Sequence, residues 1–299
     1  MDKPNPTIVL LGKNGQLGWE FTRCLQPLGQ VIALDWPDVD FSQPGQLAEK
    51  IKRLNPDLIV NAAAYTNVDK AESEPVLCNL VTHLSPAVLA ETARRVQAGI
   101  VHISTDYVFD GTNETPYTET DSPNPINYYA KSKLAGEIAV TQNCHANWVI
   151  RTAWLYSLRQ NDFVRRVLGW SREQAVLQIV DDQVGSPTWA RILAETITLA
   201  LGQGKDTFHD HLTRTAGIYH LGGDGFTTRL GWVQKILELD PQPKDQITRE
   251  VLPAKTSQFP TPARRPLYTA LDCSRFYHTF GLRLPAWDIS LGLAMENLL

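Results

Sequence analysis

The chain has 299 residues, of which 43% are apolar and 20% charged, and its formal net charge at pH 7 is −4. This length allows one large domain or two smaller ones and is sufficient to bury a core. The acidic balance and the absence of a basic tract argue against a nucleic-acid partner held by a positive field. A small-molecule substrate is therefore expected.

The cysteines and the hydropathy pattern bear on the compartment. Cys24, Cys78, Cys144 and Cys273 are scattered without a Cys-x-x-Cys pair, which disfavours a zinc site and a disulfide framework and indicates reduced thiols. Residues 1–11 do not resemble a signal peptide, and no apolar run reaches the roughly 18 residues that a membrane span needs. We expect a cytoplasmic protein that does not enter a membrane.

The first pattern along the chain is a short apolar run at residues 7–11, followed directly by a glycine-rich segment at 12–18 and then by apolar residues at helical spacing. An apolar run of this kind is typical of a parallel strand covered on both faces. Gly12 permits a tight turn, Gly15 lets a diphosphate approach the amides at a helix N-terminus, and Gly18 lets the helix pack closely. The pattern predicts a dinucleotide-binding loop, with an ordinary glycine turn as the alternative.

Strand and helix patterns continue to alternate after this loop. A strand at 31–34 ends on Asp35, whose carboxylate can accept hydrogen bonds from an adenosine ribose. Further strands are expected at 58–60, 99–103 and 148–150, with helices at 47–54 and 80–93. The small residues at 62–66 would let a flat ligand lie on the backbone. Repeated strand–helix units predict a Rossmann-type, doubly wound α/β fold that binds ligands beyond the carboxyl ends of its strands.

The segment 127–137 is predicted to be a helix that carries Tyr129 and Lys133 four residues apart. This spacing places both side chains on one face. A nearby ammonium favours the phenolate, so it lowers the phenol pKa from about 10 and helps the tyrosine to exchange a proton. The alternative is an interfacial tyrosine beside a solvated lysine.

The regular alternation ends near Trp154. A helix at about 189–201, a polar break at 202–215 that contains His209 and His211, and a proline-rich stretch at 241–266 follow. We expect an NAD(P)-binding domain at 1–154 and a smaller, mainly substrate-binding domain at 155–299. The polar break is expected to be a solvated loop, but it can also be an insertion between two elements that return to the main sheet.

Several motifs together resemble a known family. They are Gly-x-x-Gly-x-x-Gly at 12–18, Asn61 to Glu72, Ser104 to Gly111, Tyr129-x-x-x-Lys133 to Glu137, Arg151 to Tyr156, Asp182 to Thr188, and Arg264-Arg265-Pro266. The first four resemble the extended short-chain dehydrogenase/reductases, and the full set is similar to the dTDP-4-dehydrorhamnose reductase family over nearly the whole chain. The resemblance implies NAD(P)H-dependent reduction of the C4 keto group of dTDP-4-dehydro-6-deoxy-L-mannose to dTDP-L-rhamnose, the last step of dTDP-rhamnose biosynthesis.

The resemblance also implies roles for individual residues. Tyr129 donates the proton, Lys133 lowers the phenol pKa and holds the nicotinamide ribose, and Thr105 binds the carbonyl oxygen. The implied cofactor-binding residues are Gly12, Gly15, Gln16, Leu17, Gly18, Asp35, Asp40, Phe41, Ala63, Ala64, Tyr65 and Thr66, with Tyr129 and Lys133. The implied substrate-binding residues are Thr105, Asp106, Tyr107, Trp154 and Arg265, whose guanidinium suits a diphosphate.

Different residues favour NADH and NADPH as the cofactor. Asp35 favours NADH because its charge repels the 2′-phosphate of NADPH, whereas Lys13 offers a counter-charge, so NADPH and NADH are both expected. Some members of the family hold Mg²⁺ through glutamates at a dimer interface. Glu20 matches one such position, but Arg191 stands where a second glutamate is expected, so the residues disfavour a metal and leave a homodimer open.

Two other functional classes stay open from the sequence. One is a nucleotide-sugar epimerase or dehydratase of the same superfamily, although dehydratases carry Thr-Asp-Glu where this chain has Thr105-Asp106-Tyr107. The other is a non-catalytic regulatory subunit with this fold. The consumption of reduced cofactor separates these classes from a reductase.

Overall fold

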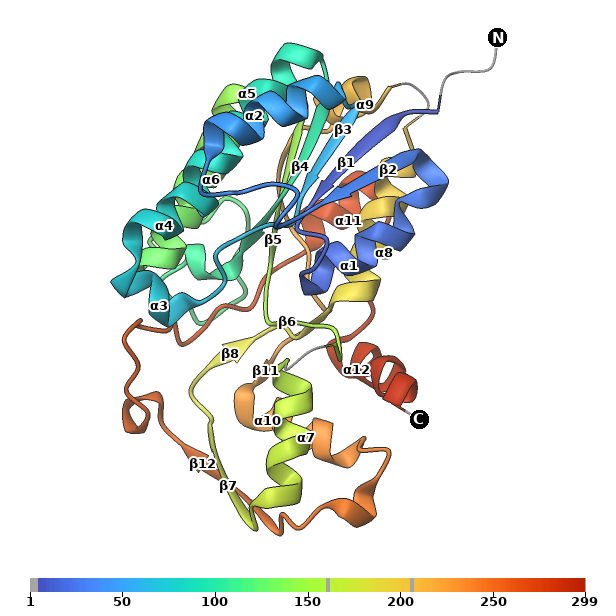
Figure 1. Ribbon diagram of the computed structural model, residues 1–299. Coiled ribbons are helices and arrows are strands. Elements are labelled where there is room, and N and C mark those ends of the chain that lie inside the picture. The colour runs from blue at the N-terminus through green and yellow to red at the C-terminus, as the bar shows by residue number, and fades with distance from the viewer. Residues whose placement is uncertain (1–4, 160–161, 205–206, 299) are drawn as a thin grey trace.

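A parallel sheet forms the centre of the molecule, which is a computed structural model that describes residues 5–159, 162–204 and 207–298 (Figure 1). Its strands are β1 (Thr7–Leu11), β2 (Gln30–Leu34), β3 (Leu58–Asn61), β4 (Gly99–Thr105), β5 (Asn147–Thr152) and β10 (Gly217–His220). The six strands are ordered β2-β1-β3-β4-β5-β10 and pair in parallel. Their carboxyl ends therefore meet at one edge, where sheets of this kind bind ligands. The predicted doubly wound sheet is confirmed.

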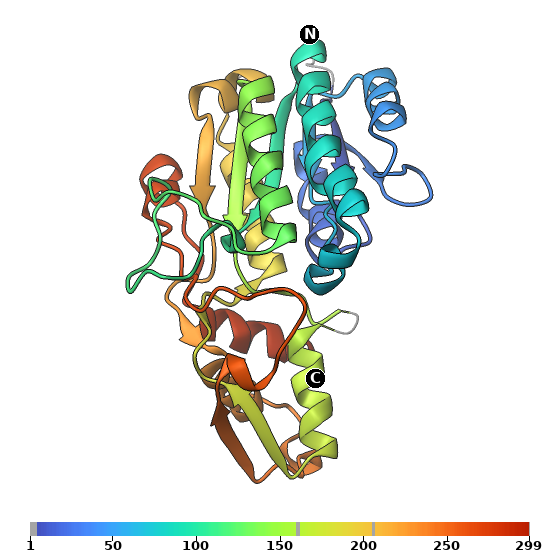
Figure 2. The same cartoon turned by 90° about the vertical axis from the view of Figure 1, so that its left-hand side faces the viewer.

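Helices cover both faces of this sheet. They are α1 (Gln16–Cys24), α2 (Pro44–Leu54), α3 (Val68–Ser73), α4 (Pro75–Asn79), α5 (Ser85–Val96), α6 (Tyr128–Asn143), α8 (Ala190–Gly202), α9 (Phe208–Arg214) and α11 (Ser274–Phe280). Helices α2, α5 and α6 lie on one face, and α1, α8 and α11 lie on the other (Figures 1 and 2). The chain therefore has three layers, helix, sheet and helix.

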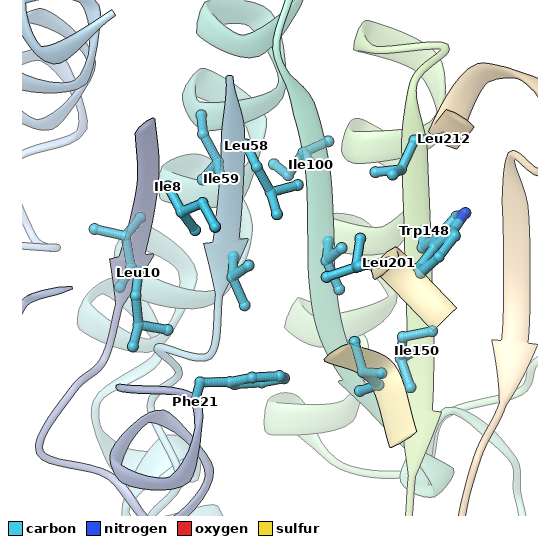
Figure 3. Packing of buried hydrophobic residues seen from close by; sticks show 14 of the residues in the cluster. Ile8, Leu10, Phe21, Leu58, Ile59, Ile100, Trp148, Ile150, Leu201 and Leu212 are labelled. Atoms are coloured by element: carbon cyan, nitrogen blue, oxygen red, sulfur yellow. The ribbon is translucent and has the colours of Figure 1, made fainter. Parts of the chain in front are cut away.

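Apolar side chains fill the space between the layers. Figure 3 shows Ile8, Leu10, Ile59, Ile100, Trp148 and Ile150 on neighbouring strands, with Phe21 from α1, Leu201 from α8 and Leu212 from α9. The central strands read as continuous apolar runs because helices cover both of their faces. This packing holds the carboxyl ends of the strands in fixed positions, and it is these ends that carry the site.

A smaller region with its own apolar core lies beyond the carboxyl edge of the sheet (Figure 1). It contains β6 (Leu155–Tyr156), α7 (Phe163–Glu173), β7 (Val176–Val180), β8 (Val184–Gly185), β9 (Thr188–Trp189), β11 (Thr227–Thr228), α10 (Arg229–Glu238), β12 (Glu250–Ala254) and α12 (Trp287–Met295). Its strands form the pairs β7–β12, β6–β9 and β8–β11. Shorter helical turns lie at Gln26–Leu28, Asp106–Val108, Pro243–Asp245, Thr256–Gln258 and Glu296–Leu298.

The second half of the chain does not stay in this smaller region. Helix α8 packs against α1, and β10 extends the sheet beside β5. These elements return to the main sheet, which is the alternative that the sequence left open. A substrate-binding role for the smaller region stays a prediction.

The expected solvated loop at 202–215 is wrong, because this segment contains α9. The Thr207 side chain accepts a hydrogen bond from the Asp210 amide and so caps the first turn. The buried His211 packs edge-to-face on Trp148 and lies with its Nε2 3.0 Å from the Ala200 carbonyl at the end of α8. Polar residues that serve as caps are the reason that the pattern resembled a loop.

The helical run Pro75–Val96 joins α4 and α5 through a π-helical segment, Leu80–Leu84. By length and composition alone it is apolar enough to cross a membrane. In the structure α5 packs against α2 and α6 and faces the core. Packing against neighbouring helices accounts for its apolar character.

Candidate active site

The carboxyl ends of the central strands open into a cavity of about 570 Å³. Its lining includes Gly12, Gly15, Gln16, Leu17, Asp35, Phe41, Ala62, Ala63, Ala64, Thr66, Thr105, Asp106, Tyr107, Tyr129, Lys133, Trp154 and Arg229. The structure thus brings most of the predicted cofactor and substrate residues to one place. Most of them meet because they lie at or just after the ends of β1, β2, β3, β4 and β5, at the same edge of the sheet. Tyr129 and Lys133 come from α6, and Arg229 comes from α10.

Glycine is needed for a different physical reason at each of the three positions in the first loop. Gly12 has a φ of +86°, which favours glycine, and its amide donates to the Leu34 carbonyl at 2.9 Å. A Cβ on Gly18 would lie 1.9 Å from the Gly12 oxygen, whereas a Cβ on Gly15 would meet only that oxygen, at 3.4 Å. Gly18 is therefore a packing residue outside the cavity lining.

Gly15 is the N-cap of α1 and has no side chain with which to bond the first turn. The first amides of an α-helix lack partners within the helix, so they suit an anion such as a diphosphate. Since Gly15 also lines the cavity, the loop fits a dinucleotide cofactor.

Asp35 lies at the predicted place, but its carboxylate is already hydrogen-bonded. One oxygen accepts from the Asn14 amide at 2.9 Å and the other from the Trp36 amide at 2.8 Å. The proposed counter-charge, Lys13, forms an ion pair with Asp38 at 2.6 Å. Asp38 therefore already neutralises part of the Lys13 charge on which the NADPH argument relied.

Two other predicted cofactor residues lie beside the cavity and outside its lining. Asp40 accepts hydrogen bonds from the amide and hydroxyl of Ser42, at 2.8 Å and 2.7 Å. The Tyr65 hydroxyl donates to Glu74 at 2.5 Å, and this bond raises the Tyr65 pKa to about 12. Both side chains are engaged in local structure, so their role toward a cofactor stays a prediction.

Helix α6 carries Tyr129 and Lys133 to the end of β4. Its N-cap is Asn127, whose side chain accepts from the Ala130 amide at 2.8 Å. Lys133 is only 2% exposed and donates to the Ile103 carbonyl, and burial lowers its pKa to about 8. This buried ammonium lies in the lining of the same cavity as the phenol.

The electrostatics of Tyr129 differ from the expectation. Burial raises the pKa of its phenol well above the ordinary value, and Thr105 lowers it by a smaller amount. The neighbouring acidic groups of Asp106 and Tyr107 raise the pKa further. The expected lowering by Lys133 is not among the main influences on the Tyr129 pKa.

Asp106 is a buried carboxyl group in the cavity wall. Burial raises its pKa from 3.8 to about 6, although Thr269 and Thr105 lower it in part. Its Oδ1 accepts from the Thr105 hydroxyl at 3.1 Å, and its Oδ2 finds no hydrogen-bond partner in the part of the chain that the structure describes. A buried polar atom of this kind in a cavity wall suits a ligand with hydroxyl groups.

The Asp106→Asn variant is expected to change how stability depends on pH. The pKa of Asp106 is higher in the folded protein than in the unfolded chain. The carboxyl group therefore adds to the free energy of unfolding below about pH 4, and this contribution is lost as the pH rises through about 6. At about pH 7.5 the variant should therefore be more stable than the wild type, by up to about 3 kcal/mol. Urea unfolding of both proteins at about pH 4.5 and 7.5 measures this difference, and parallel stabilities at the two values would contradict it.

Arg229 is a cavity residue that the sequence did not suggest. It is the first residue of α10, and its guanidinium carbon lies 3.6 Å from the centre of the Trp154 ring, which stacks on Trp232. Burial lowers its pKa to about 10. A cation in the first turn of a helix opposes the helix dipole, and this mismatch is a local signal that could have identified it.

A second cavity of about 480 Å³ adjoins the first and shares Gln16, Tyr107, Trp154, Leu155 and Arg229 with it. Its other lining residues include Arg166, Gln183, Thr256, Phe259 and Arg265. Arg265 is held by an ion pair with Asp69 at 2.7 Å. Three guanidinium groups therefore border a space next to Trp154, which suits an anionic ligand.

Glu20 and Arg191, the two positions at which some family members are described as holding Mg²⁺, form an ion pair. Arg191 Nε lies 3.6 Å from Glu20 Oε2. Residues 5–159, 162–204 and 207–298 contain no group of three or more His, Cys, Asp or Glu side chains placed to hold a metal. These positions offer no support for Mg²⁺.

Comparisons with known proteins agree with this architecture. The family model described as RmlD substrate binding domain matches residues 6–299. The dTDP-4-dehydrorhamnose reductase of Salmonella typhimurium is 41% identical over 291 residues, which cover 95% of each chain. The enzyme of the same name from Mycobacterium tuberculosis is 36% identical, with coverage of 96% of this chain and 92% of the relative.

Solved structures give the same result. A dTDP-4-dehydrorhamnose reductase from Clostridium acetobutylicum matches with a TM-score of 0.89 at 32% identity and covers 98% of this chain and 99% of its own. One from Bacillus anthracis, in complex with NADP, matches with a TM-score of 0.88 at 30% identity and the same coverage. Sequence, family model and fold agree over the full length, and the chain belongs to the dTDP-4-dehydrorhamnose reductase family.

Proposed function

We propose that this chain uses NAD(P)H to reduce the C4 keto group of dTDP-4-dehydro-L-rhamnose and so forms dTDP-L-rhamnose, the last step of dTDP-rhamnose biosynthesis. The observation that carries the proposal is the meeting of Tyr129, Thr105 and the glycine loop in one cavity of a chain of this family. The reaction would take place in the cytoplasm. A homodimer remains compatible with it.

The cavity residues divide into a cofactor side and a reaction side. Gly12, Gly15 and the first turn of α1 would hold the cofactor diphosphate, and Ala63 and Ala64 would lie against its flat rings. When bound, the reduced nicotinamide supplies the hydride. Lys133 would reach the nicotinamide ribose from the floor of the cavity.

Tyr129 is the proton donor in this proposal. Its phenol stays protonated at neutral pH because burial raises its pKa, so the acid form is ready when negative charge develops on the C4 oxygen. The Thr105 hydroxyl interacts with the phenol. To donate to the same oxygen it would turn its one proton from Asp106 Oδ1 to the substrate. Proton donation and charge stabilisation are thus assigned to adjacent side chains.

The sugar nucleotide would extend from the reaction side into the second cavity. Trp154 and Arg229 line both cavities, and they would contact the sugar where the two spaces join. Arg166, Arg229 and Arg265 place positive charge where the diphosphate would lie. Arg265 would then share its guanidinium between the phosphate and Asp69.

NADH and NADPH are both expected to serve, with a preference no larger than about tenfold, or about 1.4 kcal/mol. Asp35 would accept from the 2′-hydroxyl of NADH and repel the 2′-phosphate of NADPH. The Asp35→Ala variant should therefore shift the ratio of kcat/KM values toward NADPH. An unchanged ratio would mean that Asp35 does not face the ribose and serves only the Asn14 and Trp36 amides.

The proposal is tested by mixing the purified protein with NADPH and the 4-keto sugar nucleotide. A reductase oxidises one cofactor for each sugar converted. An epimerase converts the sugar without net oxidation of the cofactor, and a regulatory subunit does neither. Either of the last two results overturns the proposal.

A further inference from the structure

A buried histidine lies directly behind the active-site lysine. His102, on β4, is fully buried, and its Nε2 lies 3.5 Å from Lys133 Nζ. Its other ring nitrogen, Nδ1, lies 3.1 Å from the side-chain nitrogen Nδ2 of Asn61, the last residue of β3. Neither His102 nor Asn61 lines the cavity, so both would act through other groups.

The hydrogen bonds fix which ring nitrogen of His102 carries the proton. The Ala63 amide donates to Asn61 Oδ1 at 3.2 Å, which orients the Asn61 side chain with its NH₂ group toward His102. This NH₂ group can only donate, so His102 Nδ1 must be the acceptor and Nε2 must carry the proton. Burial and the Lys133 charge lower the His102 pKa well below 6.5, so the ring is neutral.

The consequence is that a donor, His102 Nε2–H, faces the Lys133 ammonium, which is also a donor. The two cannot form a hydrogen bond while the lysine is charged, so the ammonium must direct its protons elsewhere. One goes to the Ile103 carbonyl, and the open cavity is available to the others. When the lysine is neutral, by contrast, its nitrogen can accept from Nε2–H.

The other ionisable groups around Lys133 act in the opposite sense. Glu137, one turn further along α6, and Cys78, on α4, both favour the charged lysine. Glu137 is itself engaged by Arg151 at 2.7 Å and by the Ser104 hydroxyl. Tyr129, one turn before Lys133, is protonated and adds no charge. His102 is therefore the neighbour that can favour the neutral amine.

We propose that Asn61 and His102 are positioning residues for Lys133, which orient its ammonium away from the His102 ring, toward the Ile103 carbonyl and the cofactor cavity, and stabilise its neutral form. The inference deepens the proposed reduction and rests on it for its kinetic consequences. It also links the lysine to the main chain at Ala63, which borders the cofactor side of the cavity. The segment that follows β3 and the active-site lysine are thus connected through the buried side chains of Asn61 and His102.

The proposal is tested with two variants that act by different routes. In His102→Gln the new side chain can present an oxygen to Lys133, and in Asn61→Leu the ring of His102 is free to place its proton on Nδ1. Both changes replace a donor by an acceptor, so both should move the alkaline limb of the pH profile of kcat/KM upward, on the order of one pH unit. Both should also lower kcat on the order of tenfold while the Kd for NADPH changes far less.

His211→Gln is the matched control. His211, on α9, is also a buried histidine, but its ring nitrogen contacts the Ala200 carbonyl and not a lysine. Its pH profile should coincide with that of the wild type. A limb that stays at the wild-type pH in both His102→Gln and Asn61→Leu overturns the proposal. A shift of the same size in His211→Gln also overturns it, since the effect would then be a general one of altered packing.

A measurement on the wild-type protein tests the proposal without requiring that any variant fold. The ¹⁵N chemical shifts of the His102 ring report its tautomer and need no turnover. A neutral ring protonated at Nε2 is expected across the assay range, and protonation at Nδ1 overturns the proposal. This result does not depend on whether the reductase assay succeeds, so failure of the inference and failure of the proposed function can be told apart.

Discussion

Tyr129→Phe is expected to bind reduced cofactor as the wild type does and to turn over at least about 10²-fold more slowly. The substitution removes the hydroxyl that donates the proton and keeps the ring, which packs edge-to-face near Tyr107 with centroids 6.5 Å apart. Cofactor affinity is measured by fluorescence titration, and kcat by NADPH oxidation with the 4-keto substrate.

Tyr128→Phe is the natural control, because Tyr128 precedes Tyr129 on α6 and lies outside the lining of both cavities. It should keep near-wild-type kcat. Turnover by Tyr129→Phe within about threefold of this control would remove Tyr129 from the proton-transfer step.

Gly15→Val is expected to abolish cofactor binding in a protein that still folds. A Cβ at this position meets only the Gly12 oxygen, at 3.4 Å, so the chain itself leaves room for it. The branched side chain would instead occupy the space in which the diphosphate approaches the first turn of α1. The Kd for NADPH should rise by about 10²-fold or more, equivalent to about 2.8 kcal/mol.

Gly18→Ala separates cofactor binding from packing within the same loop. Its Cβ would lie 1.9 Å from the Gly12 oxygen, so α1 and the turn at Gly12 would have to move apart. The loss should appear as a lowered Tm and free energy of unfolding. If Gly15→Val keeps wild-type affinity for NADPH, the assignment of the loop to the cofactor is wrong.

The sheet was predictable from the sequence because its strands are covered on both faces. The first three residues of β3, for example, are a continuous apolar run, and the helices between strands repeat apolar residues at helical spacing. The smaller region gave no comparable pattern. Strands β6, β8, β9 and β11 have two residues each, which is too short for any periodicity, and they are held by contacts between distant segments.

The candidate site was predictable where residues lie at or just after the ends of parallel strands, as Thr105 and Asp35 do. The directions in which side chains point were not predictable from the sequence. Helical spacing places the Cβ atoms of Tyr129 and Lys133 on one face, but burial directs the lysine to the Ile103 carbonyl. Arg229 was missed because its place beside Trp154 depends on how α10 packs in the smaller region.

The central claim is that the chain moves a hydride from the cofactor to C4 of the sugar. Purified protein given NADPH deuterated at the transferring position of the nicotinamide and dTDP-4-dehydro-L-rhamnose tests it directly. The account predicts dTDP-L-rhamnose with one deuterium at C4 for each cofactor oxidised. A product without deuterium, or a sugar that is converted while the cofactor stays reduced, would contradict it.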